Sequence, residues 1–552
     1  MCGIFARIYG WSQGKQDNDN FDYNPELINR GPDSTSSISI NNILLSGYVL
    51  HLRGNLTPQP YGEDSRWLLW NGELYGNNIF GSHNLDLSMN DTQLIFNLLK
   101  EFNPVQLFSD LEACFAFIYL TPDELWFGRD FLGRRSLLMH SNESCTTLSS
   151  VGPGTQVQTG GIFKLNLHTN ECELVPWGYS GLRCPSLIRF ENCEIQSLGV
   201  FDAIERSVEK RLIGLGQIGV LFSGGLDCSV ITGICCKYLD PSTEIFLLNV
   251  SFEANSPDRI TAISSFKELQ SLFPIHKISL ILIDIDHEEL ERHKERIILL
   301  LGANDSRMDF SIGAALYFAS KGEGSNYTSG DEARFPGKIL FSGIGADEIF
   351  GGYSRYKSSF KHYGKEGVIR EMSLDLDRLW HRNMGRDDRI VSCHSRELRF
   401  PYLDTHLWLA LSKLDLDLVT QVDKPGLEKH LLREFARKMG FGATAGYKKR
   451  AIQFGTRVSQ QCNRNDFGSN RKAKGWQSIS KDKDCQIQAE IQFCCKELQD
   501  KVNLDAENSE KLIEVIGKLQ DSKVSINDKR HLMRVYIGDY VSALSSVSNE
   551  DD

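Results

Sequence analysis

The chain has 552 residues, of which 41% are hydrophobic and 24% are charged, and its formal net charge is −11. This length predicts two to four domains with large cores, and the composition argues against wholesale disorder or a fibre. The acidic balance argues against a general nucleic-acid binder. No stretch approaches the ~20 apolar residues of a membrane-spanning helix, and the first residues do not predict a secretory leader. We therefore expect a cytoplasmic protein whose partners include neither nucleic acid nor membrane.

Residues 1–180 are expected to form stacked antiparallel sheets flanked by helices, an α+β domain. Short runs of β-forming residues, such as ILLSGYVLHL, RWLLW, CFAFIYL and GIFKLNL, are separated by Gly, Asn, Asp and Pro. The pattern changes near residue 200, where Val200, Ile204 and Val208 recur at helical spacing. The change of periodicity predicts a domain boundary there.

Residues 200–460 are expected to form an α/β domain with a parallel sheet. Strand-like runs such as IGVLFSG, IFLLNVSF and KILFSG alternate with helical segments such as SVITGICCKYL. Residues 461–485 are polar and predict a linker. Residues 486–552 predict a small helical module that either closes on itself as a hairpin or binds a protein partner.

Cys2 is the first candidate for catalysis. So small a second residue predicts removal of Met1, which would leave a thiol and a free α-amine on one residue. The thiol can attack an amide carbon, while the amine, with a reference pKa near ~8, accepts the proton. Taken alone, a chance cysteine at a frayed terminus is the more common explanation.

Several motifs in fixed order give Cys2 a context. MCGI is followed by NRGPD at 29–33, NGELYG at 71–76, NDTQ at 90–93 and FGRDFLGRRSL at 127–137. Together they resemble the class II glutamine amidotransferases, specifically the amidotransferase part of the asparagine synthetases. The resemblance implies a glutamine amidotransferase type 2 domain over 1–180, with L-glutamine as a substrate.

The same resemblance implies a role for each matched residue. Cys2 would be the nucleophile, Asn71 and Gly72 would donate to an oxyanion, and Glu73 and Asp91 would bind the glutamine ammonium. The arginine that related enzymes use for the glutamine carboxylate is replaced in this chain.

Val49 and Leu50 occupy the region aligned with that arginine, and Arg53 is the nearest substitute. This departure leaves the contact to the substrate carboxylate open and favours a non-catalytic or regulatory protein that keeps the fold.

Residues 218–229, IGVLFSGGLDCS, form the second chemical signal. An apolar strand runs into a glycine-rich turn and a helix start, whose backbone N–H groups can bind phosphate oxygens. The turn lacks the GxxxxGK[ST] pattern of a Walker A loop. The GxGxxG match at 214–219 precedes its strand, so a Rossmann dinucleotide site is not expected.

SGGLDCS resembles the pyrophosphate loop of the N-type ATP pyrophosphatases, although Cys228 replaces the usual serine. FSGIGADEIFGGYSRY at 341–356 resembles a second signature of the asparagine synthetases. The resemblance implies ATP and Mg²⁺ as cofactors. The implied nucleotide contacts are Leu221, Ser223, Gly224, Gly225, Asp227, Ser229, Val250, Ser342 and Gly343, and the implied metal ligands are Asp227 and Asp347.

Cationic residues follow at two places. Lys429 and Arg433 are predicted to share one face of a helix, and Lys448, Lys449 and Arg450 form a run of positive charge. These side chains can neutralise a leaving pyrophosphate, and a solvated basic face is an equally good explanation. Which member of the run contacts phosphate stays open.

Further motifs, SPDRITAISSFKEL at 256–269, GRDDR at 385–389, SRELRFPYLD at 395–404 and KRAIQFG at 449–455, also match one branch of the asparagine synthetase family. The implied activity is transfer of ammonia from L-glutamine to ATP-activated L-aspartate, giving asparagine, AMP and pyrophosphate. Ile344 replaces a glutamate common at that step, and an isoleucine cannot move a proton. Two alternatives are therefore a catalytically impaired regulatory or scaffold protein that keeps nucleotide binding, and an enzyme with another acceptor acid.

Overall fold

The structure is a computed structural model that describes residues 2–11, 25–81, 83–142, 144–177, 197–214, 216–302, 306–424 and 426–459. Apart from residues 306–308, all of these belong to one compact unit. The predicted linker and the predicted C-terminal helical module lie outside the described residues. None of the described helices has both the length and the apolar character needed to cross a membrane.

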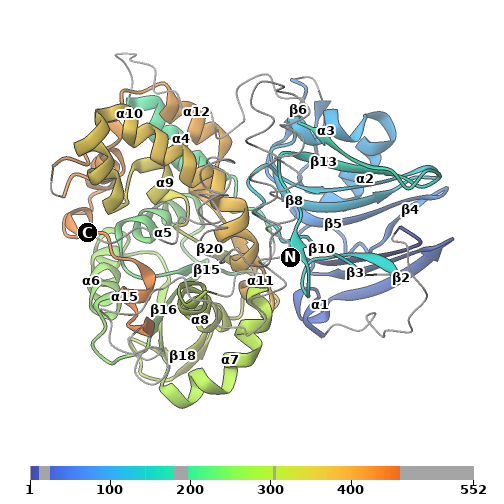
Figure 1. Ribbon diagram of the computed structural model, residues 1–552. Helices are drawn as coiled ribbons and strands as arrows, with labels where there is room; N and C mark the ends of the chain where they lie inside the picture. The colour runs from blue at the N-terminus through green and yellow to red at the C-terminus, as the bar shows by residue number, and fades with distance from the viewer. Residues whose placement is uncertain are drawn as a thin grey trace, which may run out of the picture. The chain divides into compact units, whose positions relative to one another are not determined.

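The N-terminal part contains two six-stranded antiparallel sheets (Figure 1). The first sheet, in spatial order, consists of β12 (Thr155–Gln156), β10 (Leu138–Ser141), β11 (Cys145–Ser149), β1 (Gly3–Tyr9), β3 (Ile43–Val49) and β2 (Ser34–Ile40). The second consists of β14 (Cys172–Pro176), β13 (Gly161–Asn166), β9 (Glu124–Arg129), β8 (Ala113–Leu120), β5 (Arg66–Leu74) and β4 (Tyr61–Glu63). A small ribbon, β6 (Asn78–Ile79) with β7 (His83–Asn84), lies apart from both sheets.

The alternation of side chains along these strands builds a layered core. Ile4 and Ala6 of β1 share a buried cluster with Ile118 of β8, so this cluster fills the space between the sheets. Neighbouring residues on the second sheet face outward, where Trp70 packs with residues of α2 (Asp91–Glu101) and α3 (Pro104–Asp110).

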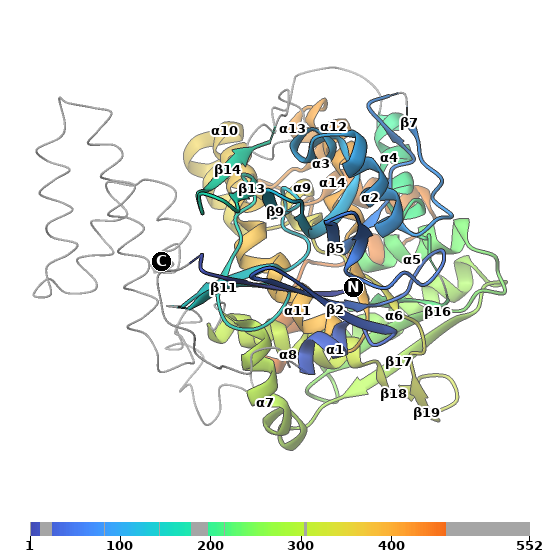
Figure 2. The ribbon, with the colours of Figure 1, turned by 90° about the vertical axis from the view of Figure 1, so that its right-hand side faces the viewer.

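Helix α1 (Pro25–Arg30) covers the outer face of the first sheet, beside β1 and β3 (Figure 2). A Cβ atom on Gly3 would lie 2.8 Å from the carbonyl oxygen of Leu27, so glycine permits this close approach. The predicted stack of antiparallel sheets flanked by helices is confirmed.

The second part is built on a seven-stranded sheet. Its strands, in spatial order, are β19 (Glu332–Arg334), β18 (Glu323–Asn326), β17 (Ile278–Asp284), β16 (Ile245–Ser251), β15 (Ile218–Leu221), β20 (Ile339–Phe341) and β21 (Glu397–Arg399). The five strands from β17 to β21 in this order are parallel, and the sequence predicts β15, β16 and β20 among them. At the other end of the sheet β18 pairs antiparallel with β17, and the edge strand β19 pairs antiparallel with β18. The sequence does not predict β18 and β19, because EGSN and EAR are short and polar.

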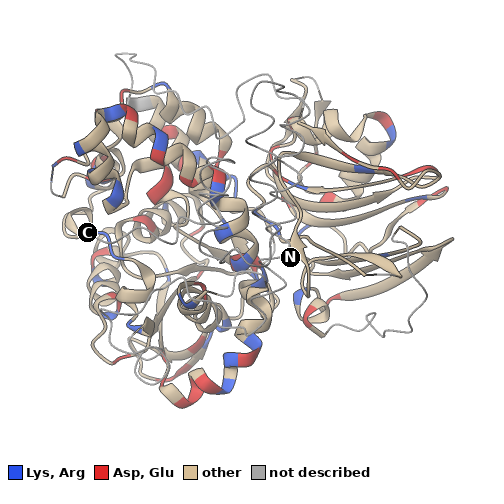
Figure 3. Cartoon of the chain, in the orientation of Figure 1, with Lys and Arg blue, Asp and Glu red and all other residues tan. Residues whose placement is uncertain are grey.

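Helices surround this sheet (Figure 1). They are α4 (Ser197–Glu209), α5 (Leu226–Tyr238), α6 (Pro257–Leu272), α7 (His287–Leu301), α8 (Arg307–Lys321), α9 (Ala346–Phe350), α10 (Ser354–Leu379), α11 (Gly385–Ser392), α12 (Thr405–Ser412), α13 (Leu416–Val419), α14 (His430–Lys438) and α15 (Ile452–Gly455). A π-helical turn, Trp380–Met384, joins α10 to α11. Helix α7 carries alternating basic and acidic residues on its surface, and Arg292 pairs there with Glu288 and Glu289 (Figure 3).

The strand order creates a site for ligands at the middle of the parallel sheet. Strand β15 has β16 on one side and β20 on the other, so the chain leaves it in one direction and later returns on the opposite side. Such a switch point leaves a crevice at the carboxyl ends of the strands. The turns after β15 and β20 meet there, because a Cβ atom on Gly343 would lie 2.9 Å from Cβ of Asp227.

Buried charges join the antiparallel sheets to the second part of the protein. Arg30 of α1 pairs with Asp388 of α11 at 2.7 Å, and both side chains are at most 1% exposed. Arg135 lies 3.3 Å from Glu397 of β21. Charges in such surroundings are costly unless they are paired, so these contacts fix the two parts against each other.

We expect Asp388→Asn to lower the free energy of unfolding by about 3 kcal/mol, because Arg30 would remain buried without its counter-charge. Urea unfolding of the full chain measures the loss. Arg292→Gln is the control, since that arginine is 60% exposed and should change stability by less than about 0.5 kcal/mol. Equal stabilities of the two variants would contradict a structural role for the buried pair.

Candidate functional site

Cys2 lies immediately before β1, the strand that runs through the middle of the first antiparallel sheet. Its carbonyl oxygen accepts a hydrogen bond of 3.3 Å from Nε of Arg30. Burial raises the pKa of the Cys2 thiol, and the nearby carboxylates of Asp91 and Glu397 raise it further. A thiol in this state is protonated at neutral pH, so a nucleophilic attack requires a base.

Gln59 connects the thiol to the second sheet. Its side-chain Nε2 lies 3.8 Å from Sγ of Cys2 and donates to the carbonyl of Trp70 at 3.0 Å and to the hydroxyl of Thr92 at 3.1 Å. Its Oε1 accepts from the Trp70 backbone N–H at 2.7 Å. Gln59 therefore fixes the thiol beside β5 and α2, although no sequence motif indicated this residue.

Asn71 and Gly72 follow Trp70, the residue that Gln59 contacts, in β5. The Asn71 side chain is fully buried, and neither its oxygen nor its nitrogen has a hydrogen-bond partner within the described part of the chain. A buried amide without partners costs free energy that a bound ligand can recover. A Cβ atom on Gly72 would lie 2.6 Å from the Trp70 ring and 2.7 Å from the Cys114 carbonyl oxygen, so only glycine fits.

Glu73 and Asp91 are brought together as the sequence predicts, but Arg53 lies between them. Nη2 of Arg53 is 3.3 Å from Glu73 and 3.9 Å from Asp91. Indole Nε1 of Trp70 donates to Asp91 at 3.0 Å. Burial raises the pKa of Glu73 to about 8, with further increases from Asp91 and Glu397 and a partial offset from Arg399 and Arg53.

Arg399 connects this carboxylate cluster to the parallel sheet. Its Nη2 lies 3.4 Å from Glu73, and its Nε donates to Glu397 at 2.8 Å. Its backbone carbonyl accepts a hydrogen bond of 3.0 Å from the N–H of Ser342, in the turn after β20. Arg399 lies in the motif SRELRFPYLD at 395–404, which resembles the asparagine synthetase family. The motif alone does not predict a role for the Arg399 side chain.

The turn between β15 and α5 has the shape that the glycine-rich motif predicts. Gly224 has φ of +75°, a conformation that favours glycine. A Cβ atom there would lie 2.3 Å from the Ala262 backbone nitrogen, since the turn rests on α6. Gly225 caps α5 and its N–H donates to Ser223 at 3.3 Å.

Cys228 and Ser229 lie in the first turn of α5, which begins at Leu226. The Cys228 thiol donates to the Gly225 carbonyl at 3.3 Å, and burial raises its pKa to about 11. This thiol therefore stabilises the turn as a neutral group. The Ser229 hydroxyl oxygen is buried and has no hydrogen-bond partner among the described residues. Among the other predicted contacts, Val250 is a buried residue next to the last residue of β16, while Ser342 and Gly343 form the turn after β20.

The predicted metal ligands face each other across Lys429. Nζ of Lys429 lies 2.7 Å from Asp227 and 2.8 Å from Asp347, and the lysine side chain is 2% exposed. At Asp227, burial is the largest effect and raises the pKa of the carboxyl group. At Asp347 the ammonium groups of Lys429 and Lys449 outweigh burial and lower the pKa.

One prediction about the cations needs correction. Helix α14 begins at His430, after Lys429 with φ of +57°, so Lys429 and Arg433 do not share a helical face. Arg433 instead donates to the carbonyls of Glu428 and Ala445 and has a structural role. Within the basic run, Lys449 lies 3.5 Å from Asp347 and over the Tyr353 ring, which places it at the acidic pair.

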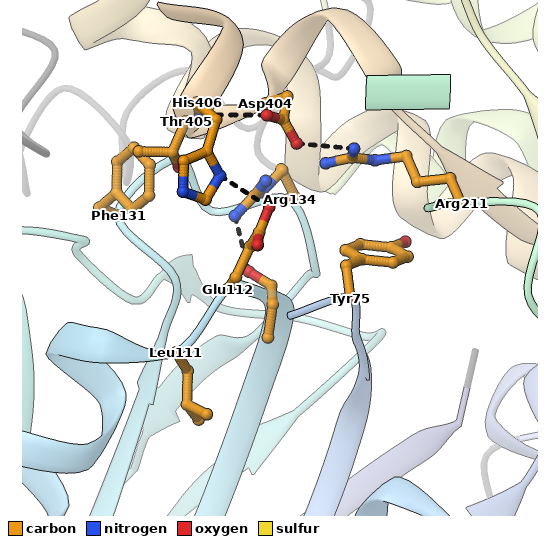
Figure 4. Close-up of a pocket in the computed structure, with 10 residues that line it drawn as sticks. Tyr75, Leu111, Glu112, Phe131, Arg134, Arg211, Asp404, Thr405 and His406 are labelled. Atoms are coloured by element: carbon orange, nitrogen blue, oxygen red, sulfur yellow. Dashed lines mark hydrogen bonds and ion pairs between the residues drawn. The ribbon is translucent and has the colours of Figure 1, made fainter. Parts of the chain in front are cut away.

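A third cluster lies where Glu112 meets Asp404 and His406 (Figure 4). Their potential ligand atoms lie within 4.8 Å of one another. However, the Lys210 ammonium lies 2.5 Å from Asp404 and contacts Glu112 as well. The adjoining cavity of about 20 Å³ has room for a single water molecule. This cluster is therefore an internally neutralised contact between the two parts.

The protein thus combines a buried thiol on stacked antiparallel sheets with a glycine-rich turn at the carboxyl end of a parallel sheet. The family model described as asparagine synthase matches residues 199–367 and 360–459. Asparagine synthetase domain-containing protein 1 of Homo sapiens is 30% identical over 631 residues, covering 85% of this chain and 97% of the relative. The chain belongs to the asparagine synthetase family.

Two further relatives cover much of the chain. An asparagine synthetase domain-containing protein of Saccharomyces cerevisiae is 31% identical, covering 79% of this chain and 88% of the relative. The glutamine-hydrolyzing asparagine synthetase of Pongo abelii is 25% identical, covering 74% of this chain and 76% of that protein.

We expect Gly224→Ala to weaken MgATP binding at least about tenfold, because a methyl group at this positive φ would displace the turn from α6. Isothermal titration of the full chain measures the affinity. Gly225→Ala is the matched control, since φ there is −71° and the nearest atom to an added Cβ lies 3.3 Å away. Unchanged affinity in Gly224→Ala would show that nucleotide does not bind this turn.

Proposed function

We propose that the protein is a glutamine-hydrolysing asparagine synthetase-like enzyme. The observation that carries the proposal is that one compact unit holds two separate centres. In one, Gln59 joins the Cys2 thiol to β5, the strand that holds the Asn71 amide, which has no hydrogen-bond partner among the described residues. In the other, a glycine-rich turn adjoins the carboxylates that Lys429 bridges. L-glutamine, L-aspartate and ATP are the proposed substrates. Membership of the asparagine synthetase family supports this assignment.

In the first half-reaction, Sγ of Cys2 attacks the side-chain amide carbon of glutamine. Its proton passes to a base, for which a free α-amine on Cys2 would serve if Met1 is removed. The Asn71 amide and a backbone N–H near Gly72 stabilise the tetrahedral oxyanion. Ammonia leaves with the transferred proton, and water hydrolyses the resulting thioester to glutamate.

In the second half-reaction, the side-chain carboxylate of aspartate attacks the α-phosphorus of ATP, and pyrophosphate leaves. Ammonia then attacks the acyl carbon of the aspartyl adenylate, giving asparagine and AMP. Asp227 and Asp347 offer the hard oxygen ligands that Mg²⁺ requires, and the ion would neutralise the pyrophosphate charge. The turn at Gly224 and Gly225 binds phosphate through its N–H groups.

Cys2→Ala should reduce glutamine-driven AMP formation by about 10³-fold or more, while ammonium salts still support the reaction, because only the ammonia source is lost. Coupled assays with L-aspartate and MgATP measure both rates. Cys172→Ala, at an exposed cysteine of β14, should leave both unchanged. Equal loss with glutamine and with ammonium would contradict separate centres.

Glutamine affinity should rise with pH up to about 8, because Glu73 must ionise to bind the substrate ammonium and its pKa lies near that value. Protonation of Glu73 at lower pH would weaken binding by up to about tenfold for each pH unit. Titrations from pH 6.5 to 8.5 in the Cys2→Ala background measure the effect without thiol ionisation. Glu73→Gln should bind more weakly and lose the dependence, and a flat profile in the parent would exclude this role.

Ile344 supports a second candidate, a regulatory protein that binds nucleotide without making asparagine. This residue lies in the turn after β20, where its N–H donates to the Ser342 hydroxyl at 3.2 Å, and it provides no acid or base. Absence of both glutaminase activity and aspartate-dependent exchange between ATP and pyrophosphate would favour this alternative. Exchange stimulated by a different acid would indicate another acceptor.

A further inference from the structure

The Lys429 ammonium lies between the two carboxylates that would hold a divalent cation. It donates a charge-assisted hydrogen bond of 2.7 Å to Asp227 and forms an ion pair with Asp347 at 2.8 Å. The second oxygen of Asp227 is buried and has no hydrogen-bond partner among the described residues. The donor set therefore suits a hard cation, and one oxygen remains uncommitted while the lysine is present.

The surroundings are shaped to accept this lysine. A Cβ atom on Gly352 would lie 2.1 Å from Oδ1 of Asp347 and 2.3 Å from Cε of Lys429, so only glycine leaves space for the stem. Lys429 itself has φ of +57°, a conformation that non-glycine residues rarely adopt. The glycine and the unusual backbone together direct the ammonium to the acidic pair.

Charge balance determines what can replace the ammonium. The cluster contains two carboxylates, Asp227 and Asp347, and two ammonium groups. Lys429 contacts both carboxylates, and Lys449 lies 3.5 Å from Asp347. The charges of these four groups therefore sum to zero. Adding a divalent cation alone would leave two uncompensated positive charges in a buried place, which is unfavourable. The phosphates of a nucleotide bring the negative charge that would accept the displaced ammonium.

We propose that Lys429 is an internal counter-ion that keeps divalent cations out of the Asp227–Asp347 site until nucleotide phosphates arrive to receive its ammonium. The proposal rests on the nucleotide site of the proposed function and adds an order to its binding. Metal and nucleotide enter together, and Lys429 moves from the carboxylates to the phosphates. Lys449 is 24% exposed and, among the described residues, lies within ion-pair distance of Asp347 but not of Asp227, so it does not bridge the two carboxylates.

The test measures the affinity of the full chain for Mn²⁺ in the absence of nucleotide. Calorimetry gives the dissociation constant, and the electron paramagnetic resonance signal of free Mn²⁺ gives an independent value. Lys429→Met should bind Mn²⁺ at least tenfold more tightly than the parent protein, because both carboxylates lose their shared cation. Lys429→Arg should behave like the parent. Lys449→Met should gain much less, because Lys429 still bridges the pair. Asp227→Asn added to Lys429→Met should remove the gain, which separates this site from surface acids.

Equal Mn²⁺ affinities in the parent and Lys429→Met would overturn the proposal. Lys429→Gln provides the same comparison if the methionine variant does not fold, because its amide can still donate to the carboxylates. With an ATP analogue carrying a methylene bridge between the α- and β-phosphorus atoms, the parent should bind Mn²⁺ at least tenfold more tightly than without it. An analogue that does not bind at all would refute the nucleotide site, while the comparison of metal alone would still decide the role of Lys429.

Discussion

Buried carboxylates at both centres are neutralised by cationic side chains of the same chain. Asp227 and Asp347 share the ammonium of Lys429, and Glu73 lies within 3.4 Å of both Arg53 and Arg399. Charges removed from water require such partners, and the cost of separating them is high. A positively charged ligand at either centre therefore competes with a group that is already bound.

At both centres, binding of a cationic ligand would require displacement of a cationic side chain from its carboxylates. At the thiol centre, an incoming ammonium would replace part of the contact between Arg53 and its carboxylates, and the guanidinium would then be available to a substrate carboxylate. At the nucleotide centre, a divalent cation would replace an ammonium, which phosphate oxygens can accept. On the proposed function, each ligand would bring both a positive and a negative charge, so that each displaced cation would have a new partner.

The sequence predicts the fold well where periodicity and turn chemistry are strong. The alternating runs of the first part and the buried strands β15, β16 and β20 are confirmed as antiparallel and parallel sheets. Strands β18 and β19 escape prediction because few residues and little apolar surface specify them. The start of α14 is also misplaced, because the sequence predicts one helix that includes Lys429, whereas Lys429 has a left-handed backbone and the helix begins at His430.

Site residues that belong to a local motif are likewise easier to foresee than those that act across the chain. Matched motifs bring Glu73 close to Asp91, and Asp227 close to Asp347, through shared contacts to Arg53 and Lys429. Gln59 and Arg399 could not be foreseen, because their contacts join elements far apart in the sequence. Arg399 is one example, because its backbone carbonyl accepts a hydrogen bond from Ser342 while its side chain contacts Glu73.

The position of Arg399 also affects how the molecule can be divided. Its guanidinium contacts the Glu73 carboxyl group in the first part, while its backbone carbonyl accepts a hydrogen bond from Ser342, in the turn after β20 of the second part. A fragment ending near residue 180 would keep the Glu73 carboxylate but lose this cation, and would expose Arg30 and Arg135 without their acids. Residues 1–180 alone would therefore lack charge partners that the second part supplies, and the thiol centre needs the intact polypeptide.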